Sequence, residues 1–96
     1  MITKETITKI LQGKKSELSE KYHLTTIGIF GSVLREDFRD ESDIDILIDY
    51  DQQLGVEFID LAEELESILE RKVDLVSRKG IKPKYFDEIC RELIYV

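Results

Sequence analysis

The chain has 96 residues, a formal net charge of −7 at pH 7, one cysteine and no tryptophan. This length predicts a single domain, residues 1–96, built around one hydrophobic core. No stretch approaches the roughly 20 apolar residues that cross a bilayer, so we expect no membrane contact. The acidic balance argues against broad, direct binding to nucleic acid, because that binding needs a basic surface.

The compartment is also constrained by the sequence. The polar N-terminal segment lacks the apolar run of a secretory signal peptide. The lone Cys90 can form no disulfide within the chain, and its helical surroundings favour a packing role. These features favour a reduced, cytoplasmic setting.

The first half of the chain predicts a helix followed by a strand. Apolar residues recur at helical spacing from about Thr3 to Tyr22. Gly13 weakens this helix by about 1 kcal/mol relative to Ala, and it marks a point where the helix could divide in two. The β-rich segment 25–30 predicts a strand that stops at Gly31, and a polar connection covers 36–42.

The second half predicts two strands and two helices. Residues 44–50 alternate isoleucine with aspartate and leucine, which is typical of a strand with two distinct faces. Residues 56–69 form an amphipathic pattern with glutamates on the outer side, and 73–76 predict a short strand. Pro83 opens a final helix, in whose first turn proline is tolerated. We therefore expect an α/β (α+β) fold with a small mixed β-sheet of three to four strands flanked by helices.

The candidate site combines a tight turn with paired carboxylates. Asp43 and Asp45 are separated by one residue, so in an extended strand they point to one face, roughly 6.6 Å apart. The Gly31-Ser32 turn offers backbone N–H groups and a hydroxyl to an anion. Taken alone, the aspartate pair is more simply explained as two solvated carboxylates at the edge of a strand.

A third carboxylate changes that balance. Asp74 stands near the start of another predicted strand, in the same position relative to its apolar run as the aspartate pair. Three carboxylates that lie together repel one another unless a cation separates them. Mg²⁺, which prefers oxygen ligands and retains water, is the expected cation, and phosphoryl or nucleotidyl transfer is the expected chemistry.

The same residues carry a family resemblance. Gly31-Ser32, Arg35, Ser42-Asp43 and Asp45 resemble the G-S-x-A-R-G … S-D-x-D-L signature of the DNA polymerase beta-like nucleotidyltransferases. In length and layout the chain is similar to the minimal nucleotidyltransferase (MNT) domains that are paired with HEPN proteins in toxin–antitoxin modules. The resemblance covers nearly the whole chain and implies the polymerase beta-like nucleotidyltransferase fold.

The resemblance also implies roles for individual residues. Gly31, Ser32 and Arg35 would bind the nucleotide, with Gly31 admitting the triphosphate close to the backbone. The catalytic and metal-binding residues would be Asp43, Asp45 and Asp74, which would hold two Mg²⁺ ions. The activity implied is transfer of AMP from ATP to a tyrosine hydroxyl of a cognate HEPN toxin, so the chain would act as that toxin's antitoxin in a hetero-oligomer.

Several readings stay open from the sequence. Leu34 stands where the family usually has Ala, and Glu36 stands where it usually has Gly, which places an extra negative charge near the phosphate side. Arg35 could contact phosphate or pair with Glu36 or Asp40. Two other functions compete with the leading one: an inactive antitoxin that neutralises its partner by contact, and an aminoglycoside-type nucleotidyltransferase that acts on a small molecule.

Overall fold

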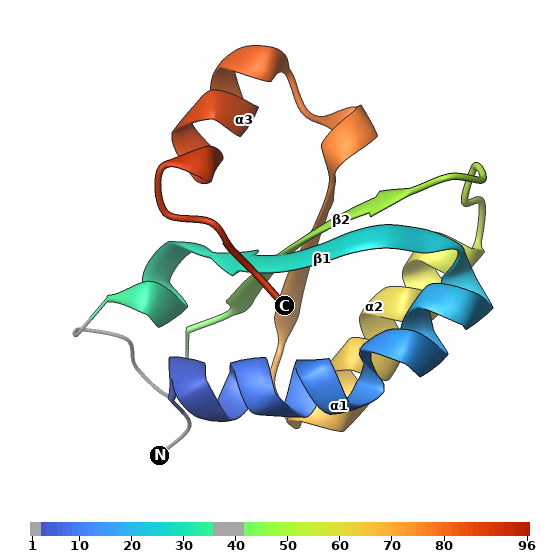
Figure 1. The fold of residues 1–96 in the computed structure, drawn as a ribbon, viewed down its shortest axis with the longest axis horizontal. Helices are drawn as coiled ribbons and strands as arrows, with labels where there is room; N and C mark the ends of the chain where they lie inside the picture. The colour runs from blue at the N-terminus through green and yellow to red at the C-terminus, as the bar shows by residue number, and fades with distance from the viewer. Residues whose placement is uncertain (1–2, 36–41) are drawn as a thin grey trace.

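The computed structural model describes residues 3–35 and 42–96, which form a four-stranded sheet flanked by helices (Figure 1). The elements are α1 (Lys4–Tyr22), β1 (Leu24–Phe30), β2 (Ile44–Tyr50), α2 (Glu57–Leu69), β3 (Val73–Ser77), α3 (Pro83–Cys90) and β4 (Ile94–Tyr95), with 3-10 turns η1 (Gly31–Leu34) and η2 (Arg78–Gly80). The sheet has the order β3-β2-β1-β4. β1 is antiparallel to β2 and β4, whereas β2 and β3 are parallel. The predicted mixed sheet is confirmed.

Both ends of α1 are capped by local hydrogen bonds. The Thr3 side chain accepts a hydrogen bond from the Thr6 backbone N–H at 3.2 Å, which satisfies one of the free donors of the first turn. The helix ends at His23, which adopts a left-handed conformation (φ 58°) and donates its backbone N–H to the Ser19 carbonyl. Gly13 does not divide the helix, which runs unbroken through this position.

The hydrophobic core lies between the sheet and the two helices α1 and α2 (Figure 1). Ile44, Ile46 and Ile48 alternate along β2 and are completely buried on this face. The predicted period of two in this strand is therefore confirmed. The other fully buried side chains of this core are Ile7, Leu11 and Leu18 from α1, Ile27 and Ile29 from β1, and Leu61 and Leu65 from α2.

Polar contacts join α2 to its neighbours. The Glu64 carboxylate accepts hydrogen bonds from Lys21 Nζ at 2.7 Å and from Tyr22 Oη at 2.9 Å. The hydrogen bond from Lys21 lowers the pKa of Glu64, and the effect of burial opposes it. Glu66 accepts a hydrogen bond from the Val73 backbone N–H at 3.0 Å, at the start of β3. These glutamates therefore connect elements as well as facing solvent.

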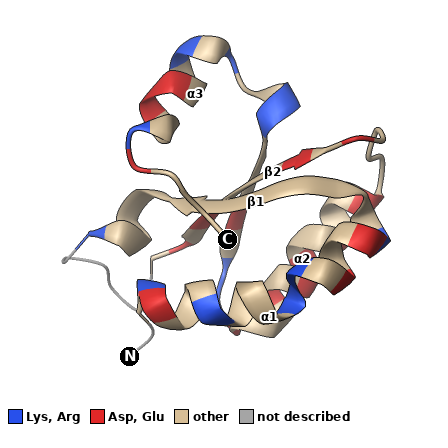
Figure 2. Ribbon diagram, viewed as in Figure 1, with Lys and Arg blue, Asp and Glu red and all other residues tan. Residues whose placement is uncertain are grey.

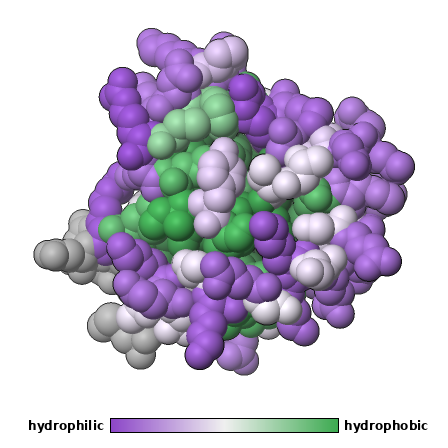
Figure 3. Space-filling view, in the orientation of Figure 1, coloured by the Kyte–Doolittle hydropathy of each residue, from purple (hydrophilic) through white to green (hydrophobic). Residues whose placement is uncertain are grey.

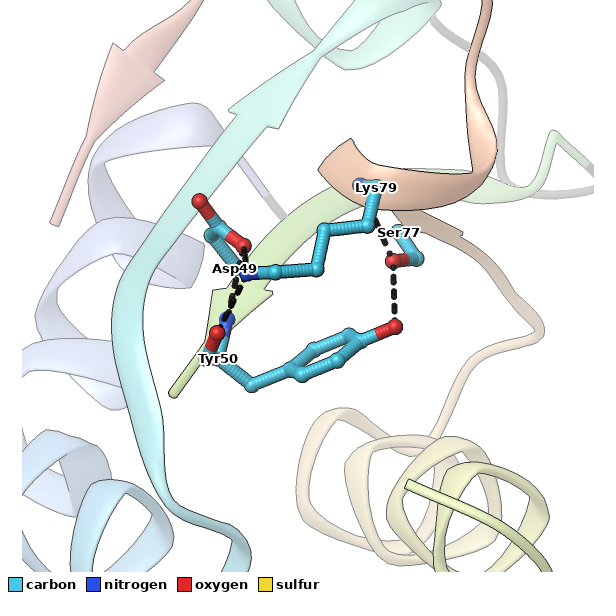
Figure 4. A network of polar contacts seen from close by, with 4 residues as sticks. All are labelled: Asp49, Tyr50, Ser77 and Lys79. Carbon is cyan, nitrogen blue, oxygen red and sulfur yellow. Dashed lines mark hydrogen bonds and ion pairs between the residues drawn. The ribbon is translucent and has the colours of Figure 1, made fainter. Parts of the chain in front are cut away.

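The end of β2 is tied to the turn after β3 (Figure 4). Lys79 Nζ donates hydrogen bonds to the Asp49 carboxylate and to the Tyr50 carbonyl, and Ser77 Oγ donates to Tyr50 Oη at 3.3 Å. Burial alone would raise the pKa of Asp49, but the Lys79 ammonium and the Tyr50 N–H lower it overall. This contact fixes η2 against the sheet.

Three local features differ from the sequence-based expectations. Cys90, the last residue of α3, is exposed, so the predicted packing role is wrong. Ile59, on the apolar side predicted for α2, is 61% exposed. The residues Ile94–Tyr95 form β4, a strand that the sequence pattern did not predict. In Figure 3, apolar side chains gather between α3 and α1, in the region of this C-terminal strand.

On α1 and α3, Lys and Arg are interspersed with Asp and Glu (Figure 2), whereas the charged residues of α2 are all acidic. Within residues 3–35 and 42–96, no helix is long and apolar enough to cross a membrane.

Candidate active site

The turn after β1 is shaped by a glycine. Gly31 has φ +79°, a backbone conformation that residues with a Cβ rarely adopt. A Cβ at this position would lie 2.0 Å from Oδ2 of Asp45. Backbone conformation and available space therefore both require glycine here, and the turn lies directly against the Asp45 carboxyl group.

The sheet brings the predicted carboxylates to one face. Asp45 is paired in register with Asp74 on the parallel strand β3 and with Phe30 on the antiparallel strand β1. Paired residues on neighbouring strands point to the same side, and neighbouring strands lie about 4.8 Å apart. Asp43 lies directly before β2, close enough for its charge to raise the pKa of Asp45. Asp45 is half-buried, whereas Asp43 and Asp74 are exposed.

The electrostatic surroundings of Asp45 are unfavourable for its charge. Burial, together with the nearby charges of Asp74, Asp43 and Glu92, raises the pKa of Asp45 to about 6. A backbone hydrogen bond from Ser32 acts in the opposite direction. This carboxyl group therefore lies where negative charge accumulates and where a cation would relieve the repulsion.

A cavity of about 540 Å³ opens beside this carboxyl group. Its walls are formed by Gly31 and Ser32 of η1, by Arg35, by Asp45, and by the end of α3 with the residues that follow it. Such a volume lies within the range of small-molecule sites. The cavity connects the predicted phosphate-binding turn to the central predicted carboxylate.

The structure adds one residue that the sequence analysis missed. The Glu92 carboxylate accepts a hydrogen bond from the Gly31 backbone N–H at 3.1 Å and pairs with the Arg35 guanidinium at 3.5 Å. Gly31 and Glu92 are 61 positions apart, and no motif surrounds Glu92. No signal in a single sequence could have found this contact. The alternative partners predicted for Arg35, Glu36 and Asp40, lie outside the described residues, as does the family departure at Glu36.

The fit to Mg²⁺ can be judged from the donor set. Within the described residues, no three Asp, Glu, His or Cys side chains form a ready-made metal cluster. Mg²⁺ commonly takes only one or two protein carboxylates and completes its shell with water and substrate phosphates. The all-oxygen set around Asp45, with its mutual repulsion, fits such a site. The predicted metal role of Asp43, Asp45 and Asp74 stays a prediction.

Comparison with known proteins places the chain in a family. The family model described as "Polymerase beta, Nucleotidyltransferase" matches residues 5–96. Protein adenylyltransferase MntA of Thermococcus cleftensis is 39% identical over 97 residues, which cover 100% of this chain and 98% of that protein.

Solved structures share the fold. A structure assigned as a minimal nucleotidyltransferase matches with a TM-score of 0.82 and 29% identity, covering 97% of this chain and 95% of that chain. A toxin–antitoxin structure with AMP-PNP matches with a TM-score of 0.73 and 25% identity, covering 88% of this chain and 70% of that chain. The complex of an MNT antitoxin with the tri-AMPylated Shewanella oneidensis HEPN toxin, at 23% identity and a TM-score of 0.67 over 91% of this chain and 69% of that one, supports the fold alone.

The model match spans nearly the whole chain, and the identity to MntA extends from end to end. The strand pairing that places Asp45 beside Asp74 belongs to the same fold. The chain is therefore a member of the polymerase beta nucleotidyltransferase family, with protein adenylyltransferases among its relatives.

Proposed function

We propose that this chain is a Mg²⁺-dependent adenylyltransferase that transfers AMP from ATP to a tyrosine hydroxyl of a HEPN toxin, and so acts as its antitoxin in the cytoplasm. The observation that carries the proposal is the position of Asp45, in register with Asp74 and packed against Gly31 at the edge of one cavity. The relative named as a protein adenylyltransferase supports the reaction class, and the toxin–antitoxin structure with AMP-PNP supports the nucleotide and the partner.

Each predicted residue has a role in this proposal. Gly31 allows the triphosphate to approach the backbone, Ser32 donates its hydroxyl to a phosphate oxygen, and Arg35 offers a positive charge to the phosphates. Asp43, Asp45 and Asp74 would hold the Mg²⁺ ions, which would supply positive charge to the phosphates and to the attacking and leaving oxygens.

The reaction is an in-line displacement at the α-phosphate. The tyrosine oxygen forms a bond to the α-phosphorus while the bond to the bridging oxygen of the β-phosphate breaks, and pyrophosphate leaves. Asp74, on the neighbouring strand, accepts the proton of the attacking hydroxyl. The site contributes by positioning the reactants and by preorganised charge. The small size of the chain leaves the acceptor surface to be completed by the partner protein.

The test uses the double variant Asp43→Asn/Asp45→Asn, the cognate toxin, Mg²⁺ and ATP, with intact-mass measurement of the toxin. We expect an AMP-sized mass increase with the wild-type chain and a rate at least about 100-fold lower with the variant. The control variant Asp51→Asn/Asp60→Asn removes the same charge from exposed positions outside the site and is expected to retain the rate.

Two outcomes would reject this function. If the wild-type chain adds no mass to the toxin and the site variant still neutralises it fully, the chain is a binding antitoxin. If ATP is consumed with an aminoglycoside and without a partner protein, the acceptor is a small molecule.

A further inference from the structure

The anion-binding turn of this protein already holds an anion from its own chain. Oε1 of Glu92 accepts the Gly31 N–H at 3.1 Å, and Oε2 lies 3.5 Å from the Arg35 guanidinium. The proposed function brings the nucleotide phosphates to the backbone at Gly31 and to the positive charge of Arg35. Both carboxylate oxygens of one side chain therefore lie where phosphate oxygens would be bound.

The contact of Glu92 with Gly31 and Arg35 differs from an ordinary ion pair on the protein surface. Its side chain is only 35% exposed, it lies on the wall of the cavity, and its hydrogen bond to Gly31 is partly buried. A single N–H group makes one good hydrogen bond at a time, so a phosphate oxygen and Glu92 compete for Gly31. The negative charge of Glu92 would also repel an incoming triphosphate.

We propose that Glu92 is an internal competitor of the nucleotide phosphates: it holds the Gly31 turn and Arg35 when ATP is absent, and it is displaced when ATP binds. This inference rests on the proposed function and names a step that controls nucleotide entry. The apparent affinity for ATP is then reduced by the fraction of molecules in which Glu92 occupies the turn.

Displacement of Glu92 reaches the C-terminal strand. Glu92 is followed directly by Leu93, which packs against Gly28, and by β4, which pairs with β1. A nucleotide that moves Glu92 therefore acts on the segment that completes this edge of the sheet. Nucleotide occupancy and the conformation of the C-terminal segment are coupled in this arrangement.

The test measures binding of ATP, and of tripolyphosphate, to the wild-type chain and to Glu92→Gln by calorimetry at fixed Mg²⁺. Glutamine retains the acceptor for Gly31 but removes the charge, so we expect both ligands to bind about fivefold more tightly. The control Glu63→Gln removes one charge from α2; Glu63 is exposed and does not line the cavity. We expect its affinity to change less than twofold. Equal or weaker binding by Glu92→Gln overturns the inference.

A measurement on the wild-type chain tests the inference without depending on the folding of a variant. The ¹³Cδ resonance of Glu92 and the amide resonance of Gly31 are expected to shift together as ATP is added, with one common saturation curve. An unchanged Glu92 resonance at saturating ATP overturns the inference without any substitution.

The two proposals fail in different ways. Transfer of AMP to the toxin by the wild type, combined with no gain in affinity for Glu92→Gln, rejects the competitor role alone. Tighter binding by Glu92→Gln without any transfer of AMP rejects the proposed function and supports the competition. Absence of ATP binding in both proteins overturns both.

Discussion

Asp45 lies where burial and like charge act in the same direction. The half-buried carboxyl group faces Asp74, Asp43 and Glu92, and its pKa rises to about 6 from its usual value near 3.8. When this group is ionised it opposes folding, because the unfolded chain would solvate the charge fully. A cation bound beside Asp45 would remove this electrostatic destabilisation of the folded state.

This electrostatic cost predicts an unusual pH dependence for Asp45→Asn. Between about pH 4 and pH 6 the folded state binds more protons at Asp45 than the unfolded state, so the contribution of Asp45 to stability falls as the pH rises through this range. We expect the variant to have a Tm on the order of 3–6 °C higher than the wild type at pH 7.5 in metal-free buffer. The difference should shrink toward zero at pH 4.

Calorimetry of both proteins across this pH range checks the prediction. Mg²⁺ should raise the Tm of the wild type and have a smaller effect on the variant, because the ion stabilises the ionised carboxylate. A Tm difference that is constant from pH 4 to pH 7.5 would contradict the assigned surroundings of Asp45.

At the scale of the elements, the C-terminal segment is joined to the sheet through a glycine. A Cβ at Gly28 would lie 2.7 Å from Cδ1 of Leu93 and 3.3 Å from the Ile94 carbonyl oxygen. The backbone N–H of Val96 also donates to the Ile27 carbonyl at 2.9 Å. Because Gly28 has no side chain, the segment between α3 and the C-terminus can lie close beside β1 and pair with it.

The variant Gly28→Val should therefore be destabilised. Its side chain would overlap Leu93 and the backbone of β4, and we expect a loss of about 1–3 kcal/mol in the free energy of unfolding. Gly13→Ala is the matched control: a Cβ there meets nothing within 4 Å, and alanine in a helix should add about 0.5–1 kcal/mol. Urea unfolding of the two variants measures both effects, and equal stability of Gly28→Val and the wild type would refute the close packing.

At the scale of the whole molecule, one core connects α1, α2 and the strands. Its buried side chains come from both halves of the chain, including Leu11 of α1, Ile46 of β2 and Leu65 of α2. Neither half can bury its apolar face without the other. The single domain over residues 1–96, expected from the length of the chain, stays a prediction that this shared core supports.

The chain should therefore unfold in one cooperative step. We expect the calorimetric and van't Hoff enthalpies to agree, with a heat-capacity change of about 1.2–1.4 kcal/mol/K for this length. The unfolding curves from circular dichroism and from tyrosine fluorescence should coincide. The chain has four tyrosines, whose fluorescence reports on tertiary structure, and it has no tryptophan. Two separable transitions would show that the segment from α3 onward is an independent unit.

Local periodicity determined most of the elements. The alternation along 44–50 gave both the boundaries of β2 and its two faces, because the period of two is a property of any extended chain. Pro83 marked a helix start through its fixed φ angle, whereas the cap that Thr3 provides for α1 emerged only from the structure. The shared face of Asp43 and Asp45 stays a prediction, because Asp43 lies just before β2.

Only the tertiary structure decided which distant groups meet. The parallel pairing of β2 with β3 sets Asp74 beside Asp45, and the return of the chain as β4 brings Glu92 to Gly31. These contacts depend on chain crossovers and on packing against a glycine, neither of which has a local period. The exposure of Cys90 was likewise decided by the tertiary structure, in which α3 has no buried residue. The sequence by itself supplied the residue types of the candidate site, and the fold decided which of them are neighbours, because residue type is local and proximity is not.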